Sequence, residues 1–241
     1  MIDPRVFHDH PLVEGAVLFG SHARGDSDMH SDIDVAVFAK AADIETLGEI
    51  KTELVKNPTN ESLALSLYST RTAEIMAQDG SLFLWHLSLE GKVVFERGLW
   101  ISSLFARLRP YGKNKALRDL RTFERILNDV RNALQLAEAT ALFEAAIMYA
   151  ILRNSSMIYT HAKGIPCFGR SEPIAWLADG MAERFPLLES EIARLEALRL
   201  AYTRFPAMPF VGPKTDWCLR ICSKVAAVLG FVRKSIDAKE S

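Results

Sequence analysis

Two aspartates lie one residue apart, a short distance behind a glycine–serine pair near the start of the chain. Gly20 and Ser21 follow an apolar run that ends at Phe19, and Asp32 and Asp34 open a second apolar run. Side chains alternate faces along a strand, so the two carboxylates are expected to point the same way. Two such carboxylates repel each other unless a cation lies between them, and Mg2+ takes oxygen ligands together with phosphates. The glycine permits close backbone approach and the serine adds a hydroxyl, which suits a triphosphate.

The order of these elements resembles a known pattern. Residues 18–25 read LFGSHARG and residues 31–38 read SDIDVAVF. An apolar strand, Gly-Ser, Ala-Arg-Gly, Ser-Asp-Ile-Asp and a second apolar strand resemble the DNA polymerase β-like nucleotidyltransferase superfamily, and most of all its minimal nucleotidyltransferase branch. The resemblance covers about the first third of the chain. The alternative for this pattern is a surface hairpin with a polar loop and a chance acidic pair.

The resemblance implies an enzyme that moves a nucleoside monophosphate onto an acceptor hydroxyl and releases pyrophosphate. We expect ATP as the donor, with AMP transferred, but the sequence does not decide between ATP and another nucleoside triphosphate. Asp32 and Asp34 would be catalytic and would hold one or two Mg2+ ions. Gly20 and Ser21 would hold the β- and γ-phosphates. The acceptor is open between a small molecule, a protein and an RNA end.

Arg24 has two interpretations. Its guanidinium fork suits phosphate and therefore places it among the nucleotide-binding candidates. It is equally suited to pair with Asp26 or Asp28 and order the loop.

A third carboxylate is expected on a later strand, where the family uses it for metal binding or as general base. In this sequence the matching strand is 63–69, and Ser66 occupies the expected position. A hydroxyl cannot replace a carboxylate as base, so Glu61 at the strand start is the predicted catalytic base. Without such a group the chain would bind a nucleotide and not transfer it efficiently.

Apolar periodicity divides the chain into an α+β part and an all-helical part. Strands are expected at 13–19, 33–39, 63–68 and 91–96, with helices at 43–56, 73–78 and 81–89. The fold predicted is an α+β nucleotidyltransferase core, a small mixed sheet with helices on one side in the resembled family, over residues 1–97. An all-α helical bundle over 98–241 follows, with a central buried helix at 141–158. Its plan resembles the helical domains of antibiotic nucleotidyltransferases and the HEPN bundles paired with minimal nucleotidyltransferases.

Composition sets the compartment and the partners. Residues 1–98 contain 8 basic and 16 acidic residues, and residues 99–241 contain 21 basic and 14 acidic residues. An acidic metal site facing a basic wall and a plain difference between helical surfaces explain this asymmetry equally well. The first residues show no secretory pattern and no run is apolar enough to span a bilayer, so no membrane partner is expected. Three cysteines without framework spacing favour a reducing compartment, the cytoplasm.

Several other groups carry weaker alternatives. The bulky segment 80–91 could form a purine pocket, dock the two halves or bury an amphipathic helix, and the last is favoured. A basic stripe on the helix after residue 113 either contacts triphosphate or RNA, or is a solvated face; the solvated face is favoured. Cys218 and Cys222 are expected in the core. The stripe consists of Arg118, Arg121 and Arg125.

Two rival functions follow from the helical half. One is an antitoxin-like regulator or binding-only member of a toxin–antitoxin pair, with a homodimer or a toxin or antitoxin as partner. The other is a HEPN-like ribonuclease, because Arg153, Asn154 and His161 resemble the Arg-Asn…His motif of that family. The spacing between Arg153 and His161 is longer than in the family motif, which makes the ribonuclease the least favoured interpretation.

Overall fold

The chain folds into two compact units. A computed structural model describes residues 4–27, 31–56, 63–136, 140–204 and 212–238. Contacts divide it into Met1–Gly112 and Lys113–Ser241. The division falls later than the boundary of 97/98 expected from the sequence. The reason is that Ile101 and Leu104 of α6 (Trp100–Ala106) are buried in the core of the first unit.

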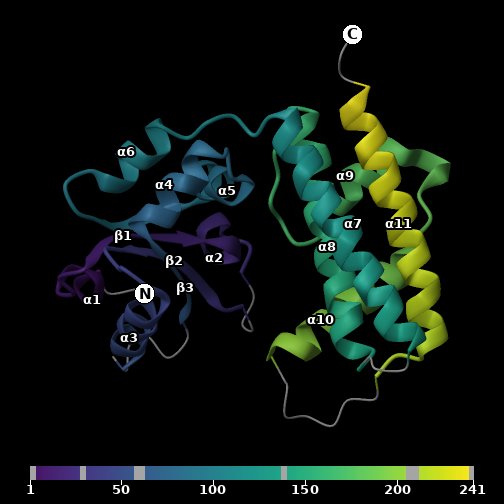
Figure 1. The fold of residues 1–241 in the computed structure, drawn as a ribbon, viewed down its shortest axis with the longest axis horizontal. Coiled ribbons are helices and arrows are strands. Elements are labelled where there is room, and N and C mark those ends of the chain that lie inside the picture. The colour runs from purple at the N-terminus through teal and green to yellow at the C-terminus, as the bar shows by residue number, and fades with distance from the viewer. Residues whose placement is uncertain (1–3, 28–30, 57–62, 137–139, 205–211, 239–241) are drawn as a thin grey trace. The chain divides into compact units, whose positions relative to one another are not determined.

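A mixed four-stranded sheet forms the centre of the first unit (Figure 1). Its strand order is β3-β2-β1-β4, with β1 antiparallel to both β2 and β4, and β2 parallel to β3. The parallel pair needs a crossover, which α3 provides. The strands are β1 (Val13–Phe19), β2 (Ile33–Ala39), β3 (Leu63–Ser69) and β4 (Lys92–Glu96).

Helices cover both faces of this sheet, not one face as expected from the resemblance. On one face the buried cluster includes Val35, Val37 and residues of α1 (Arg5–His8) and α3 (Ile44–Val55). On the other face Ala36 and Phe38 pack with α4 (Thr70–Gln78), α5 (Leu82–Glu90) and α6. Figure 1 shows α4, α5 and α6 on one side of the strands and α1 and α3 on the other. Because side chains alternate along β2, both faces of the strand are apolar and both are buried.

The described residues of the second unit form helices joined by loops and contain no strand, as expected. Its central helix is α8, which is buried over most of its length and contacts α7, α9, α10 and α11. Among the described residues, no helix is both long enough and apolar enough to cross a bilayer. The elements are α7 (Lys113–Gln135), α8 (Leu142–Ala162), α9 (Glu172–Met181), η2 (Ala182–Arg184), α10 (Glu189–Arg204) and α11 (Thr215–Asp237).

Candidate functional site

The carboxylate of Asp34 lies against the backbone of Gly20. Strand pairing places Phe19, the last residue of β1, opposite Asp34 of β2. Gly20 has φ of +70°, and a Cβ built on it would lie 2.6 Å from Oδ2 of Asp34. An L side chain would be strained by that φ and would collide with the carboxylate. The glycine therefore lets the acid reach the bend at which the sequence predicts a phosphate site.

Ser21 follows Gly20 in the chain, and Asp32 lies two residues before Asp34. Ser21 is half-buried in α2 (Gly20–Arg24), a single helical turn. Gly25 ends the helix with φ of +85° and donates its backbone N–H to the Ser21 carbonyl at 2.8 Å. Asp32 lies one residue before β2 and is exposed, whereas Asp34 is within the strand and half-buried.

His22 links the bend to the start of β2. Its Nε2 lies 3.2 Å from the carbonyl oxygen of Ser31, the residue before Asp32. The contact therefore joins α2 to the residues just before β2. A separation of nine residues in a loop gives no signal from which this contact could be predicted.

Arg24 is held by two carboxylates. Its Nε donates to Asp26 Oδ2 and its Nη1 to Glu90 Oε2, both at 3.2 Å. Glu90 Oε2 also lies 3.4 Å from Nε2 of His86, one helical turn earlier in α5. The structure thus shows the loop-ordering interpretation of Arg24. The sequence predicted a partner in Asp26 or Asp28 and missed Glu90, which is 66 residues away.

These contacts shift the acid–base properties of both partners. Burial alone would raise the pKa of Glu90, but hydrogen bonds from His86 and Arg24 outweigh burial and lower it. Burial alone would lower the pKa of Arg24, but its bonds to Asp26 and Glu90 outweigh burial and raise it. The pair is therefore charged at neutral pH and ties α2 to α5.

A third carboxylate beside Asp34 is missing from β3. In the parallel register Ala64 lies next to Asp34, and Ser66 lies next to Ala36 on the same face. Glu61, the predicted base, lies outside the described residues. Within the described ranges, no three His, Cys, Asp or Glu side chains come together in a way that could hold a metal ion. A metal bound here would need ligands from the nucleotide as well as from the two aspartates.

Aromatic side chains pack beside the bend. Phe83 of α5 lies 5.5 Å from Phe19 and 5.3 Å from Tyr68 between ring centroids. Leu84 and Leu87 of the same helix are fully buried. The segment 80–91 is therefore mainly the buried amphipathic helix that the sequence favoured.

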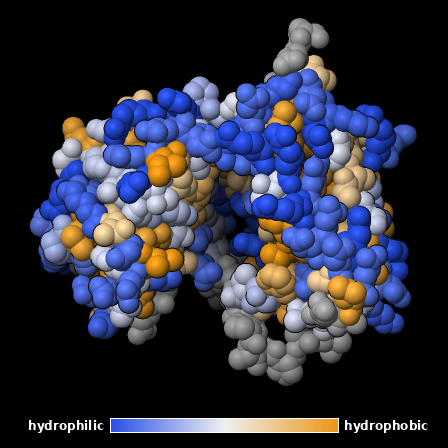
Figure 2. All heavy atoms as spheres, viewed as in Figure 1, coloured by the Kyte–Doolittle hydropathy of each residue, from blue (hydrophilic) through white to orange (hydrophobic). Residues whose placement is uncertain are grey.

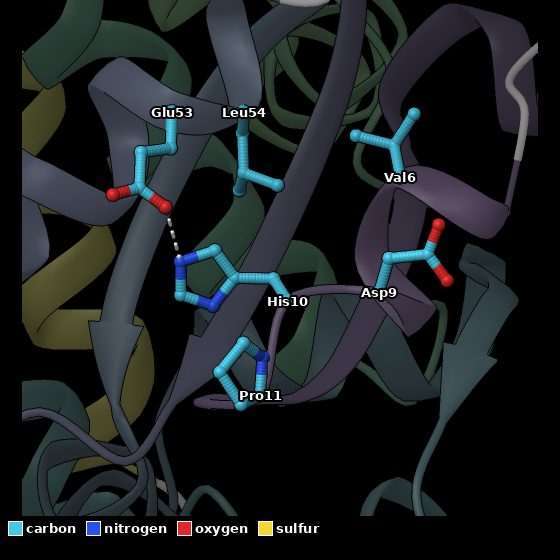
Figure 3. A pocket seen from close by; sticks show the side chains of 6 residues that line it. All are labelled: Val6, Asp9, His10, Pro11, Glu53 and Leu54. Carbon is cyan, nitrogen blue, oxygen red and sulfur yellow. Dashed lines mark ion pairs between the residues drawn. The ribbon is translucent and has the colours of Figure 1, made fainter.

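A pocket of about 280 Å3 opens at the other end of the sheet (Figure 3). His10 Nε2 lies 3.2 Å from Glu53 Oε2 across it. Its residues precede Val13 or lie in the last turn of α3, whereas Asp34 pairs with Phe19 at the far end of β1, about 20 Å away along seven residues. The pocket is thus separate from the candidate site. Its lining consists of Val6, Asp9, His10, Pro11, Glu53 and Leu54.

The helical unit does not bring the ribonuclease candidates together. Arg153 donates from Nε to the Gly169 carbonyl at 3.0 Å and from Nη2 to that of Phe168. His161 lies eight residues further along the same helix, about 12 Å along its axis. Burial lowers the pKa of His161. Arg153 thus fixes the loop before α9.

The cysteines occupy the core, as expected. Cys218 and Cys222 are buried in α11, with Sγ atoms 3.8 Å from the Ala141 carbonyl and 3.7 Å from the Leu127 carbonyl. Cys167 is also buried, and all three cysteines are reduced.

Comparison with protein families identifies the first unit. Residues 4–98 match the family model described as polymerase beta, nucleotidyltransferase. The match confirms the resemblance for this part of the chain, and the matched range contains Gly20, Ser21, Asp32 and Asp34. No curated protein matches the sequence.

Solved structures show weaker likenesses. A toxin–antitoxin structure with AMP-PNP is 20% identical, with 52% of this chain and 93% of that chain covered and a TM-score of 0.32. A double mutant of the toxin–antitoxin MntA–HpeT is 18% identical, with coverages of 54% and 98% and a TM-score of 0.33. A nucleotidyltransferase-like protein from Exiguobacterium sibiricum 255-15 is 12% identical, with coverages of 96% and 71% and a TM-score of 0.32. At these values the likenesses carry no weight for the function.

Proposed function

We propose that the first unit transfers a nucleoside monophosphate, AMP from ATP, to an acceptor hydroxyl in the presence of Mg2+. The observation that supports this most is the contact between Gly20 and Asp34, with Oδ2 2.6 Å from the position of a Cβ. It joins the two halves of the motif, the glycine–serine bend and the acidic pair, at one place. The family of residues 4–98 supports the same class of reaction.

The residues at the bend fit Mg2+ bound together with a triphosphate. Mg2+ is commonly held by one or two carboxylates plus phosphate oxygens, not by a cage of protein ligands. Asp32 and Asp34 supply two carboxylates of the kind required, and the absence of a third ligand among the described residues agrees with ligation completed by the substrate. When bound, the ion would neutralise charge on the triphosphate and on the departing pyrophosphate.

The chain's own residues position the nucleotide. Ser21 offers a hydroxyl to the β- or γ-phosphate, and Gly20 lets the phosphates approach the backbone. Arg24 acts through its pair with Glu90, which fixes α2 against α5. In the reaction the acceptor oxygen bonds to the α-phosphorus, the bond from that phosphorus to the bridging oxygen breaks, and pyrophosphate leaves with the electron pair. Most of the rate gain would come from positioning and charge neutralisation.

The acceptor's proton needs a base, and Glu61 remains the prediction for it. Ser66 shares a face with Asp34 but lacks a group that could take the proton at neutral pH.

The test is pyrophosphate release from ATP with and without Mg2+, together with mass spectrometry of candidate acceptors. Asp34→Asn should lower the rate by on the order of 100-fold or more, the loss expected when several kcal/mol of charge stabilisation disappear. Asp9→Asn is the matched control, because it removes an exposed carboxylate of the same unit at the pocket end of the sheet. Equal losses in both variants, or full activity of Asp34→Asn, would refute the proposal.

The missing acid on β3 favours one alternative, a member that binds nucleotide without turnover. The face of β3 beside Asp34 carries Ala64, Ser66 and Tyr68. Tight binding of ATP with Mg2+, combined with no pyrophosphate from any nucleoside triphosphate, would support the alternative. Ser66→Asp should then create activity if only the third acid is lacking. A toxin or antitoxin partner, a homodimer and a cytoplasmic location stay predictions.

A further inference from the structure

The outer face of α7 carries a row of side chains that are all hydrogen-bond donors. Six exposed residues follow one another at spacings of three and four, which keeps them on one side of a helix. None of them is acidic and none is apolar. This row, the α7 donor strip, consists of Arg118, Arg121, Arg125, Asn128, Asn132 and Gln135.

The opposite side of α7 explains why the strip faces water. Leu120, Leu127 and Leu134 are buried, and α7 packs on α8 and α11. The helix is therefore amphipathic, with its apolar stripe in the core and the strip turned away from it. Figure 2 shows hydrophilic side chains over much of the face that α7 and α11 present.

The acids of α7 lie beside the strip and two of them pair with other cations. Asp119 Oδ1 is 2.7 Å from Nζ of Lys115, and Glu124 Oε1 is 3.4 Å from Nη1 of Arg233 on α11. The sequence favoured a solvated face for the three arginines. A third acid of α7, Asp129, is exposed and lies four residues after Arg125, on the side of the strip. Along the whole of α7 six lysines and arginines face three acids, so the helix keeps an excess of positive charge.

We propose that the α7 donor strip binds the phosphate backbone of single-stranded nucleic acid. Phosphate and sugar oxygens are mainly acceptors, and arginine, asparagine and glutamine are among the side chains that contact them. From residue 118 to residue 135 the strip is about 25 Å long, at 1.5 Å per residue. That length is several times the distance between neighbouring phosphates of one strand, so the strip can contact several phosphates at once.

Composition favours this occupant over other anionic partners. A membrane-binding helix needs exposed apolar residues beside its basic ones, and the strip has none. The amides of Asn128, Asn132 and Gln135 can donate to phosphate and sugar oxygens and can also bond base edges, which an acidic protein surface does not offer.

The experiment measures binding of the full chain to a fluorescein-labelled 20-nucleotide oligouridylate by anisotropy, at several salt concentrations, in EDTA and without nucleotide. The strip variant is Arg118→Gln/Arg121→Gln/Arg125→Gln. Each phosphate contact contributes about 0.7 to the salt slope, so the variant should lower the slope by about 2 and the affinity by about 100-fold at 0.1 M salt.

The matched control removes three charges from exposed residues of the same unit outside the strip: Lys163→Gln/Lys214→Gln/Arg220→Gln. It should keep the affinity within about 5-fold, because salt screens distant charges. Asn128→Asp/Asn132→Asp is a near-isosteric second variant that places acids in the strip and should also weaken binding, with helix content by circular dichroism unchanged.

The proposal is overturned if the wild type does not bind, if the strip variant and the control lose affinity equally, or if duplex DNA binds more tightly than the single strand. Binding that polyglutamate displaces as readily as a nucleic acid competitor of equal charge also overturns it. The inference is independent of nucleotidyl transfer, because Asp34→Asn should bind the oligonucleotide as the wild type does.

Discussion

Replacing Gly20 with alanine tests whether the close approach of Asp34 to this residue supports binding of Mg2+ and ATP. The positive φ of Gly20 costs an alanine about 1–2 kcal/mol. The new methyl carbon would also lie 2.6 Å from Oδ2 of Asp34, and ordinary contact begins at 3.4 Å, so the carboxylate must move by the difference of about 0.8 Å. Mg2+ demands near-ideal geometry at about 2.0–2.1 Å, and disturbing a group that supports a metal ligand costs about 10–100-fold in affinity.

Gly25→Ala is the matched control. Gly25 follows the last residue of the same short helix with φ of +85°, and an added Cβ would meet nothing within 4 Å. Both variants should lose about 1–2 kcal/mol of stability, seen as a lower Tm in calorimetry of the full chain. Calorimetric titration with ATP and Mg2+ should show a loss of about 10–100-fold for Gly20→Ala and little change for Gly25→Ala. Equal affinities for the two variants would refute the proposed role of the Gly20–Asp34 contact.

Three other variants or reagents probe both units. Glu90→Gln should lower the free energy of unfolding at neutral pH by about 1–3 kcal/mol, because it removes the charge that holds Arg24. Since the folded-state pKa of Glu90 lies below its ordinary 4.5, this contribution is complete above pH 4.5 and disappears as the pH falls through the folded pKa. Thermal unfolding of both proteins over the acid range checks this, and a difference that persists in strong acid contradicts it. Burial raises the pKa of Cys218 to about 11, so a thiol reagent should modify it slowly in the native protein and quickly after unfolding; fast native reaction would show that α11 is not packed as described. Arg153→Lys keeps the charge but loses one of two donors to the 168–169 carbonyls, and a Tm lowered by several degrees is expected, with no change contradicting the contact.

The strands and long helices could be predicted because their patterns are strong. The strands 13–19 and 33–39 were predicted with the bounds that the structure gives them, since each is a short apolar run that ends at a glycine or begins at an acid. The central helix of the second unit was also correct, because its residues are apolar on nearly every side. The spacing of apolar residues within each segment is enough to predict such a strand or helix.

Features that depend on distant contacts could not be predicted. The turn after Phe19 forms a helix because Gly25 can end it with positive φ, which a motif does not reveal. The unit boundary moved to Gly112 because α6 packs back on the sheet, and residues 98–112 carry no signal of that packing. Glu90 is the clearest case, since only the fold brings α5 to Arg24.

Part of the local geometry around the site could be predicted. Asp34 was expected close to the glycine–serine pair, and its Oδ2 lies 2.6 Å from the Cβ position of Gly20, whereas the roles of both residues stay predictions. The register of β3 confirms that Ser66 shares the face of Asp34 and also shows Ala64 as its direct neighbour. Glu61, the predicted base, lies outside the described residues and stays a prediction.

A crystal structure of the chain with a non-hydrolysable ATP analogue and Mg2+ tests the central claim most directly. It should show the ion bound by oxygens of both Asp32 and Asp34 at about 2.0–2.1 Å, with the β- and γ-phosphates beside Gly20 and Ser21. A nucleotide bound elsewhere on the unit, or a metal that touches neither aspartate, would contradict it.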